Sequence, residues 1–96
     1  MALHYLQVTI GAANTQISST RIPCRQVIVQ NNAAHSCRVA DKNVSSTKGA
    51  LLNASGGAGQ GGGTMNFGPF QAYNTDLTEW WINGTQNDVI DVLYVQ

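Results

Sequence analysis

Charged side chains are scarce in this 96-residue chain. It has five lysines and arginines and five aspartates and glutamates, so charged residues make up 10% of the chain and the formal net charge is zero. Ordinary domains contain about 25% charged residues. So few cations argue against nucleic-acid binding, which needs clustered lysine and arginine. A surface with so little charge does not repel its neighbours and suits a protein that ends up covered.

Long apolar segments are missing too. No run approaches the roughly 18 apolar residues of a membrane span. Residues 1–6 have neither the basic start nor the apolar centre of a secretory signal. We therefore expect a protein that folds in a cytoplasm and has no membrane partner.

Cysteines number only two, Cys24 and Cys37. Cytoplasmic cysteines are normally reduced. If residues 25–41 form a β-hairpin, Cys37 lies opposite Ile28, and Cys24 lies four residues further along the strand. That separation exceeds the Cα distance of about 7 Å that a disulfide can bridge. The pattern predicts two buried, unbridged thiols.

Alternating apolar and polar residues recur in short stretches that are typical of β-strands. The predicted strands are residues 6–10, 15–18, 26–30, 37–39, 51–52, 64–67, 80–82 and 88–95. The last of them is apolar on both faces, which predicts a central or covered strand. Asn83 and Gly84 form a dipeptide typical of hairpin turns, so we expect the last two strands to pair. Residues 76–79 are consistent with either one helical turn or a loop.

The strand pattern predicts one all-β domain that spans residues 1–96. No window shows the apolar spacing of a helix. Several short strands with frequent turns fit a small antiparallel β-sandwich, with a jelly roll as a candidate topology, or a small barrel.

Glycine is concentrated in residues 56–63, where six of eight residues are glycine. Ordering such a segment costs much backbone entropy, so we expect a flexible loop. Residues 57–62 formally match the G-x-G-x-x-G motif of dinucleotide-binding proteins. That motif needs a following helix to hold the pyrophosphate. Residues 63–69 instead have the pattern of a strand and a turn, so we expect no nucleotide cofactor.

Catalytic and metal-binding residues form no recognisable pattern. The possible zinc ligands are His4, Cys24, His35 and Cys37. Their spacing matches no usual zinc motif, so we expect no metal. His35, Asp41 and Ser45 are the residue types of a catalytic triad, but no nucleophile elbow accompanies them. We expect a protein that is not an enzyme.

Aromatic residues are the best candidates for binding. Trp80 and Trp81 are adjacent on a predicted strand, so their side chains point to opposite faces. One can pack in the core, and the other covers an interface or stacks on a sugar. Tryptophan is enriched at interfaces, which favours an interface over sugar stacking. The candidate core or interface anchors are Tyr5, Phe67, Phe70, Trp80, Trp81 and Tyr94.

Several segments, in this order, resemble small virion proteins of tailed bacteriophages. They are residues 26–32 (QVIVQNN), 38–41 (RVAD), 43–45 (NVS), 49–52 (GALL), 67–70 (FGPF), 81–85 (WINGT) and 88–94 (DVIDVLY). The resemblance covers roughly residues 25–95. The glycine tract departs from the pattern of that group.

This resemblance implies a β-sandwich on the exterior of a phage capsid, assembled in the cytoplasm of the bacterial host. The expected function is a capsid cement or decoration protein, with the major capsid protein as its partner. We also expect a homo-oligomer, a dimer or a trimer, because identical copies usually associate symmetrically. The alternative is a glycan-binding module or a protein of the tail or fibre.

Overall fold

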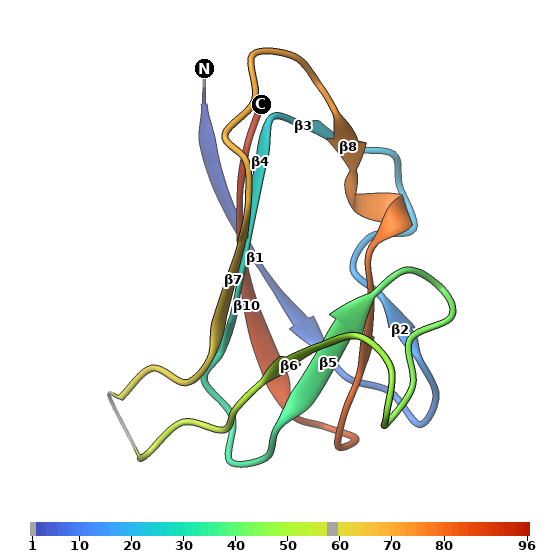
Figure 1. Ribbon diagram of the computed structural model, residues 1–96, viewed down its shortest axis with the longest axis vertical. Coiled ribbons are helices and arrows are strands. Elements are labelled where there is room, and N and C mark those ends of the chain that lie inside the picture. Colours follow the sequence, from blue (N-terminus) through green and yellow to red (C-terminus); the bar gives the residue numbers. More distant parts are fainter. Residues whose placement is uncertain (1, 58–59) are drawn as a thin grey trace.

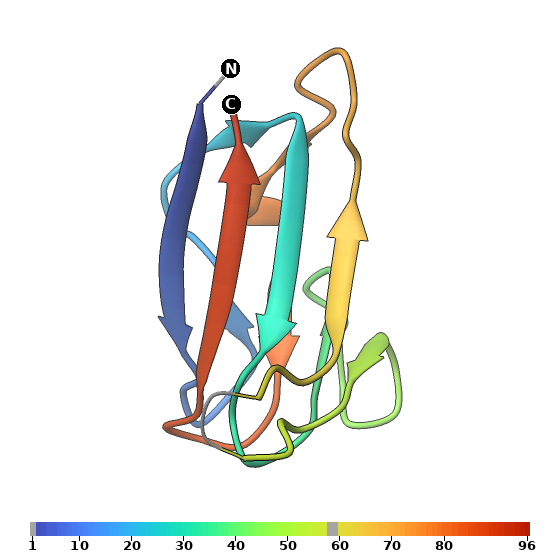
Figure 2. The same ribbon diagram turned by 90° about the vertical axis from the view of Figure 1, so that its left-hand side faces the viewer.

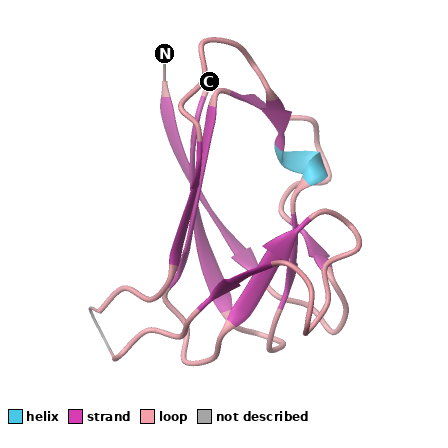
Figure 3. Cartoon of the chain, in the orientation of Figure 1, coloured by secondary structure: helices cyan, strands magenta, loops and turns pink. Residues whose placement is uncertain are grey.

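The computed structural model describes residues 2–57 and 60–96. Strands and loops make up nearly all of the described chain (Figure 3). The strands are β1 (Leu3–Thr9), β2 (Thr15–Gln16), β3 (Pro23–Cys24), β4 (Gln26–Asn31), β5 (Cys37–Ala40), β6 (Ala50–Leu52), β7 (Thr64–Phe67), β8 (Thr75–Asp76), β9 (Trp81–Asn83) and β10 (Val89–Val95). A short 3-10 helix, η1 (Leu77–Glu79), precedes β9. The predicted all-β fold is confirmed.

The strands form two four-stranded antiparallel sheets that face each other (Figure 1). Sheet A has the order β1-β10-β4-β7, which Figure 2 shows face on. Sheet B has the order β2-β9-β5-β6. The small pair β3 and β8 lies at the end of the molecule that also holds the described ends of the chain. β10 lies between β1 and β4, as its two apolar faces predict.

Strand pairing is nested along the chain. β1 pairs with β10, β2 with β9, β3 with β8, β4 with β7 and β5 with β6. The chain is thus one long antiparallel ribbon with its tip between β5 and β6. The ribbon folds over so that β10 also pairs with β4, and β9 with β5. These two additional pairings turn the ribbon into two facing sheets.

Both sheets contribute to a single hydrophobic core. Along β4, Val27 and Val29 are fully buried while their neighbours are partly exposed, so alternate residues face inward. The other buried members come from both sheets and their loops: Val8, Ile10, Ile17, Cys24, Cys37, Val39, Leu52, Leu77, Ile82, Ile90 and Val92. This shared core gives a β-sandwich-like arrangement.

Two predicted hairpins are wrong. Residues 25–41 do not form a hairpin, because β4 lies in sheet A and β5 in sheet B. The last two strands do not pair either, since β9 belongs to sheet B and β10 to sheet A. Gly84 instead packs closely between the sheets: an added Cβ would lie 2.8 Å from Ile10 Cδ1 and 3.0 Å from Cys37 Cβ. In both places the polar segment connects the two sheets.

Asn31 ties the two sheets together at the end of β4. Its side chain is fully buried, and its amide nitrogen donates to the carbonyl oxygens of His35, at 2.8 Å, and Leu52, at 3.1 Å. Its side-chain oxygen accepts a hydrogen bond from the backbone N–H of Ala33 at 2.9 Å. All three polar positions are therefore satisfied where water cannot reach.

Part of the glycine tract has a defined place. Gly62 N–H donates to the Asn31 carbonyl, and Gly63 N–H donates to the Asn53 carbonyl, both at 2.9 Å. A Cβ on Gly62 would lie 2.3 Å from the Asn31 oxygen, so only glycine fits there. Flexibility stays a prediction for residues 58 and 59, which lie outside the described residues.

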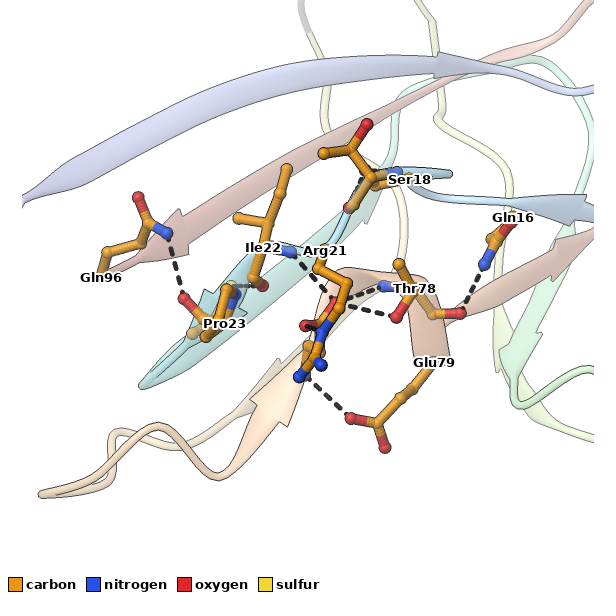
Figure 4. A network of polar contacts seen from close by, with 11 residues as sticks. Gln16, Ser18, Arg21, Ile22, Pro23, Thr78, Glu79 and Gln96 are labelled. Carbon is orange, nitrogen blue, oxygen red and sulfur yellow. Dashed lines mark hydrogen bonds and ion pairs between the residues drawn. The ribbon is translucent and has the colours of Figure 1, made fainter.

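Asp76 organises the end of the molecule next to η1. Its carboxylate accepts hydrogen bonds from the Ile22 and Thr78 backbones and from the Thr78 hydroxyl, and it pairs with Arg21 at 3.2 Å. Figure 4 shows Arg21, Ile22 and Thr78 gathered in this network. Glu79 accepts from the Asp76 backbone N–H, which completes a capping box. Burial raises the pKa of Asp76, but these hydrogen bonds outweigh it and lower the pKa from 3.8 to about 2.

Candidate interaction surfaces

The outer face of sheet A combines an apolar half with a polar half. The register places Leu3 beside Val95, and Tyr5 beside Leu93 and Ile28. We call these five residues the sheet A patch. Leu3 is 67% exposed and Tyr5 is 56% exposed, whereas the other three are partly buried by their neighbours. A contiguous apolar patch with a polar rim is typical of a protein contact site.

The polar half begins one row further along the strands. Gln7, Asp91, Gln30 and Thr64 lie side by side there. The Tyr5 hydroxyl donates to Asp91 at 2.6 Å, and the Gln7 amide donates to the same oxygen at 3.1 Å. Burial raises the pKa of Asp91, but the donors, which include the Asn32 amide, lower it overall. The hydrogen bond between Tyr5 and Asp91 raises the pKa of Tyr5.

The charge of the Asp91 carboxylate is thus stabilised by hydrogen bonds from neutral donors. Its hydrogen bonds hold the side chains of Tyr5 and Gln7 across β1 and β10, so these two side chains are ordered on the outer face. A surface whose side chains are already ordered loses less entropy on binding.

A second candidate surface is a cluster of three predicted aromatic residues. The Phe67 ring meets Phe70 edge to face at 5.0 Å and Trp80 at 5.3 Å between ring centroids. The Trp80 indole N–H donates to Thr75 Oγ1 at 2.8 Å. A cleft of about 300 Å³ opens beside Phe67 and Trp80, with Met65 and Val39 also in its wall. Asp41 and Glu79 also line this cleft, which has the size to hold one side chain of a partner.

The remaining predicted aromatics lie elsewhere. Trp81 pairs with Gln16 and Ala40 and alternates with buried Ile82, so it lies on the outer face of sheet B. Tyr94 lies on the same face of β10 as buried Val92, packs against the core and stacks on His4 with 5.1 Å between ring centroids. The six predicted anchors therefore fall on four separate places instead of one site.

A third surface is a hollow of about 750 Å³ beside the glycine tract. Its described lining carries amides and a hydroxyl from Gln30, Asn32, Ser55 and Gln60, with Ala34 and three glycines between them. No charged residue is in this lining. Such a surface suits a neutral, hydrogen-bonding ligand better than an anion or a metal ion.

The residues considered for catalysis do not come together. His35 Nδ1 lies 3.0 Å from Asp88, the Asp41 carboxylate accepts from the Asn43 backbone, and Ser45 contacts Thr47. Among residues 2–57 and 60–96, no three His, Cys, Asp or Glu side chains are close enough to hold a metal ion.

Both cysteines are free and buried. Burial raises the pKa of Cys24 and of Cys37 to about 11, with smaller contributions from Asp76 and Asp88 respectively. Thiols of this kind are poor nucleophiles at neutral pH. The strand pairing that was used to argue against a disulfide is wrong, although the cysteines are unbridged: Cys37 lies opposite Leu52 and not Ile28, and Cys24 lies opposite Thr75.

Sequence reasoning missed four of the five residues of the sheet A patch. Leu3, Ile28, Leu93 and Val95 were not singled out, although the two apolar faces of residues 88–95 were noted. Because Ile90 and Val92 face inward, Leu93 and Val95 must lie on the outer face of the same strand.

Searches against protein-family models, curated proteins and solved structures each found no match. Within the described chain, no helix has the length and apolar character needed to cross a membrane.

Proposed function

We propose that this chain is a non-enzymatic structural protein of a tailed-phage virion, which cements or decorates the capsid exterior by bridging capsid subunits. The observation that supports this best is the sheet A patch. It places exposed Leu3 and Tyr5 on a regular sheet of a chain with only 10% charged residues. The segments that resemble phage virion proteins point to the same function.

The nested strand pairing supports the proposal as well. An eight-stranded double sheet built from two interleaved Greek keys is a jelly roll, an architecture found in viral capsid and lectin domains. The four nested pairs of sheets A and B, with β10 on β4 and β9 on β5, match that arrangement. We therefore propose a jelly roll with β3 and β8 as an additional pair.

In the proposed mechanism, the sheet A patch lies against the major capsid protein. Burial of apolar surface contributes roughly 25 cal/mol per Å², so one small patch gives only modest affinity after the entropy of association is subtracted. Repetition over the capsid lattice and association between copies then multiply the gain through avidity. The cleft beside Phe67 and Trp80 offers a second contact for a neighbouring subunit.

The test is quantitative mass spectrometry of purified virions from the phage that encodes this chain. A copy number comparable to that of the major capsid protein is the expected result. A handful of copies per particle would place the protein in the tail, and its absence from washed virions would refute a structural role.

The hollow beside the glycine tract favours one alternative, a glycan-binding module. Amides and hydroxyls such as Gln30, Asn32 and Ser55 suit the hydroxyl groups of a neutral sugar. Titration of the ¹⁵N-labelled protein with the surface polysaccharide of the host separates the two functions. Saturable shifts of the Gln30 and Asn32 side-chain amides support glycan binding, and unchanged spectra at millimolar sugar exclude it at this site.

A further inference from the structure

β1 is the longest open edge of the two main sheets. The four edge strands of sheets A and B are β1 with seven residues, β7 with four, β6 with three and β2 with two. β1 pairs regularly with β10 over its whole length, without a bulge. An edge strand of this length presents a row of unpaired backbone groups to solvent.

The hydrogen-bond pattern identifies those groups. Ala2 and Gln96 exchange both of their backbone hydrogen bonds, and Ile10 N–H donates to Asp88 at the other end of the ladder. Because antiparallel pairs alternate, even-numbered residues of β1 bond to β10 and odd-numbered residues point away from it. The N–H and C=O groups of Leu3, Tyr5, Gln7 and Thr9 therefore face the open edge.

This edge has none of the features that normally block pairing. Proteins protect exposed edges with lysine, proline, a bulge or a very short strand. The β1 sequence LHYLQVT has no lysine, arginine, aspartate, glutamate or proline. By contrast, β7 is followed at once by Gly68 and Pro69.

We propose that β1 pairs antiparallel with β1 of a second copy of the chain, which joins the two A sheets into one eight-stranded sheet. Full overlap of two seven-residue strands puts the two-fold axis at Leu6. Leu3 then lies opposite Thr9 of the second copy, and Tyr5 opposite Gln7, so the open groups of both edges bond to each other. Leu6 meets Leu6 at the axis as a non-hydrogen-bonded pair.

A second copy is the occupant that fits these observations. Both edges have the same length and the same open residues, and an isologous contact needs such a self-complementary surface. β1 contains no formally charged residue, so no like charges would meet across the contact. The two sheet A patches would also lie on one face of the joined sheet, which doubles the apolar surface. The pairing does not depend on the proposed role in a virion.

Hydrogen exchange measured against protein concentration tests the pairing directly. At concentrations where sedimentation gives a monomer, the Tyr5 and Gln7 amides should exchange fast, whereas the Leu6 and Val8 amides, bonded to β10, should be protected. In the dimer, all four should be protected. Fast exchange of Tyr5 and Gln7 in a proven dimer overturns the proposal, and so does a monomer at every concentration up to the millimolar range.

A matched pair of variants separates the backbone from the side chain. Gln7→Ala removes the Gln7 side chain and its bond to Asp91 but keeps the open N–H, so the dimer should persist. Gln7→Pro removes that N–H without breaking a bond to β10, and we expect at least a tenfold weaker dimer. Circular dichroism checks that both variants fold. Dimers of equal strength in the two variants would contradict edge pairing.

Cysteine cross-linking tests the register without weakening the dimer. Leu6→Cys places two thiols at the axis, where Cα atoms of a non-hydrogen-bonded pair lie about 4.5 Å apart and a disulfide is feasible. Thr9→Cys places its thiols about 20 Å apart, six residue positions along the strands, and serves as the control. Mild oxidation should give a covalent dimer with Leu6→Cys only. Cross-linking of Thr9→Cys, or of neither variant, would refute this register.

Discussion

The strands of sheet A are four to seven residues long, whereas those of sheet B are two to four residues long. Outer side chains of sheet A bond mainly to one another across strands, as Gln26 does to Asn66 and Gln30 to Thr64. Outer side chains of sheet B bond to loops instead. Arg38, for example, donates to the carbonyls of Ser46 and Gly49.

Under the proposed function, this difference assigns the two sheets different parts. Long backbone ladders hold sheet A, which leaves its outer face and its edge for the proposed partners. Side chains of sheet B bond to the segments around it, so we expect its outer face to contribute to stability. Predictions follow from this contrast, in order of decreasing effect. They concern the shared core, the junction of the sheets at Gly62, the end closed by β3 and β8, and the two outer faces.

The largest effects are expected in the core that both sheets share. Ile90 of sheet A and Ile82 of sheet B are both fully buried. Each Ile→Ala substitution should lower the free energy of unfolding by about 2–5 kcal/mol, a large part of the stability of a small domain. Urea denaturation measures both. A loss below about 1 kcal/mol for either variant would show that its sheet does not share the core.

The junction between the sheets should respond to a single methyl group. Gly62→Ala places a Cβ 2.3 Å from the Asn31 carbonyl oxygen and 2.5 Å from that of Asn53, and backbone cannot move aside as a side chain can. We expect a loss of about 2 kcal/mol or more, since overpacking typically costs 1–3 kcal/mol.

Gly61→Ala is the matched control for the junction. Its Cβ would meet the flexible end of the Gln30 side chain, at 2.5 Å from Nε2, so the loss should stay below about 1 kcal/mol. Equal melting temperatures of the two variants would contradict the close packing of Gly62.

The end that β3 and β8 close should weaken in acid. Asp76 has its pKa lowered to about 2 in the folded state, so the stability it contributes is complete above its ordinary value of 3.8 and is lost as the pH falls from about 4 to 2. We expect a contribution of about 1–2 kcal/mol. Denaturation at several pH values should show a shallower acid loss in Asp76→Asn, and an unchanged slope would contradict the assignment.

The two outer faces should give the smallest effects and differ from each other. Arg38→Ala in sheet B should cost about 1 kcal/mol because two loop carbonyls lose their donor. Leu93→Gln in sheet A should cost less, because that side chain lies on the outer face beside Tyr5 and Ile28. A larger loss for Leu93→Gln, measured by thermal denaturation, would reverse the contrast between the sheets.

The sequence predicted strands well and their partners poorly. The alternation of residues 26–30 and 37–39 shows that each is extended with one buried face, but it contains no information about which strand lies beside it. Asn83 and Gly84 are typical of a hairpin, yet Gly84 packs closely against Ile10, 74 positions away in sequence. Long-range packing of this kind overrides local turn preference.

The candidate surface was only partly predictable for the same reason. Aromatic character singled out Tyr94, but its position in phase with Val92 places it on the inner face of sheet A, against the core. The apolar residues of the sheet A patch come from three strands that are far apart in sequence. Their contact depends on the register of β1, β10 and β4, which only the structure provides.

Photo-cross-linking in assembled virions tests the central claim most directly. A benzophenone amino acid replaces Leu93, on the outer face of sheet A, or Leu51, which is 50% exposed on the outer face of sheet B. The account predicts cross-links from position 93 to the major capsid protein and none from position 51. Cross-links from position 51 alone, or from position 93 only to tail proteins, would contradict it.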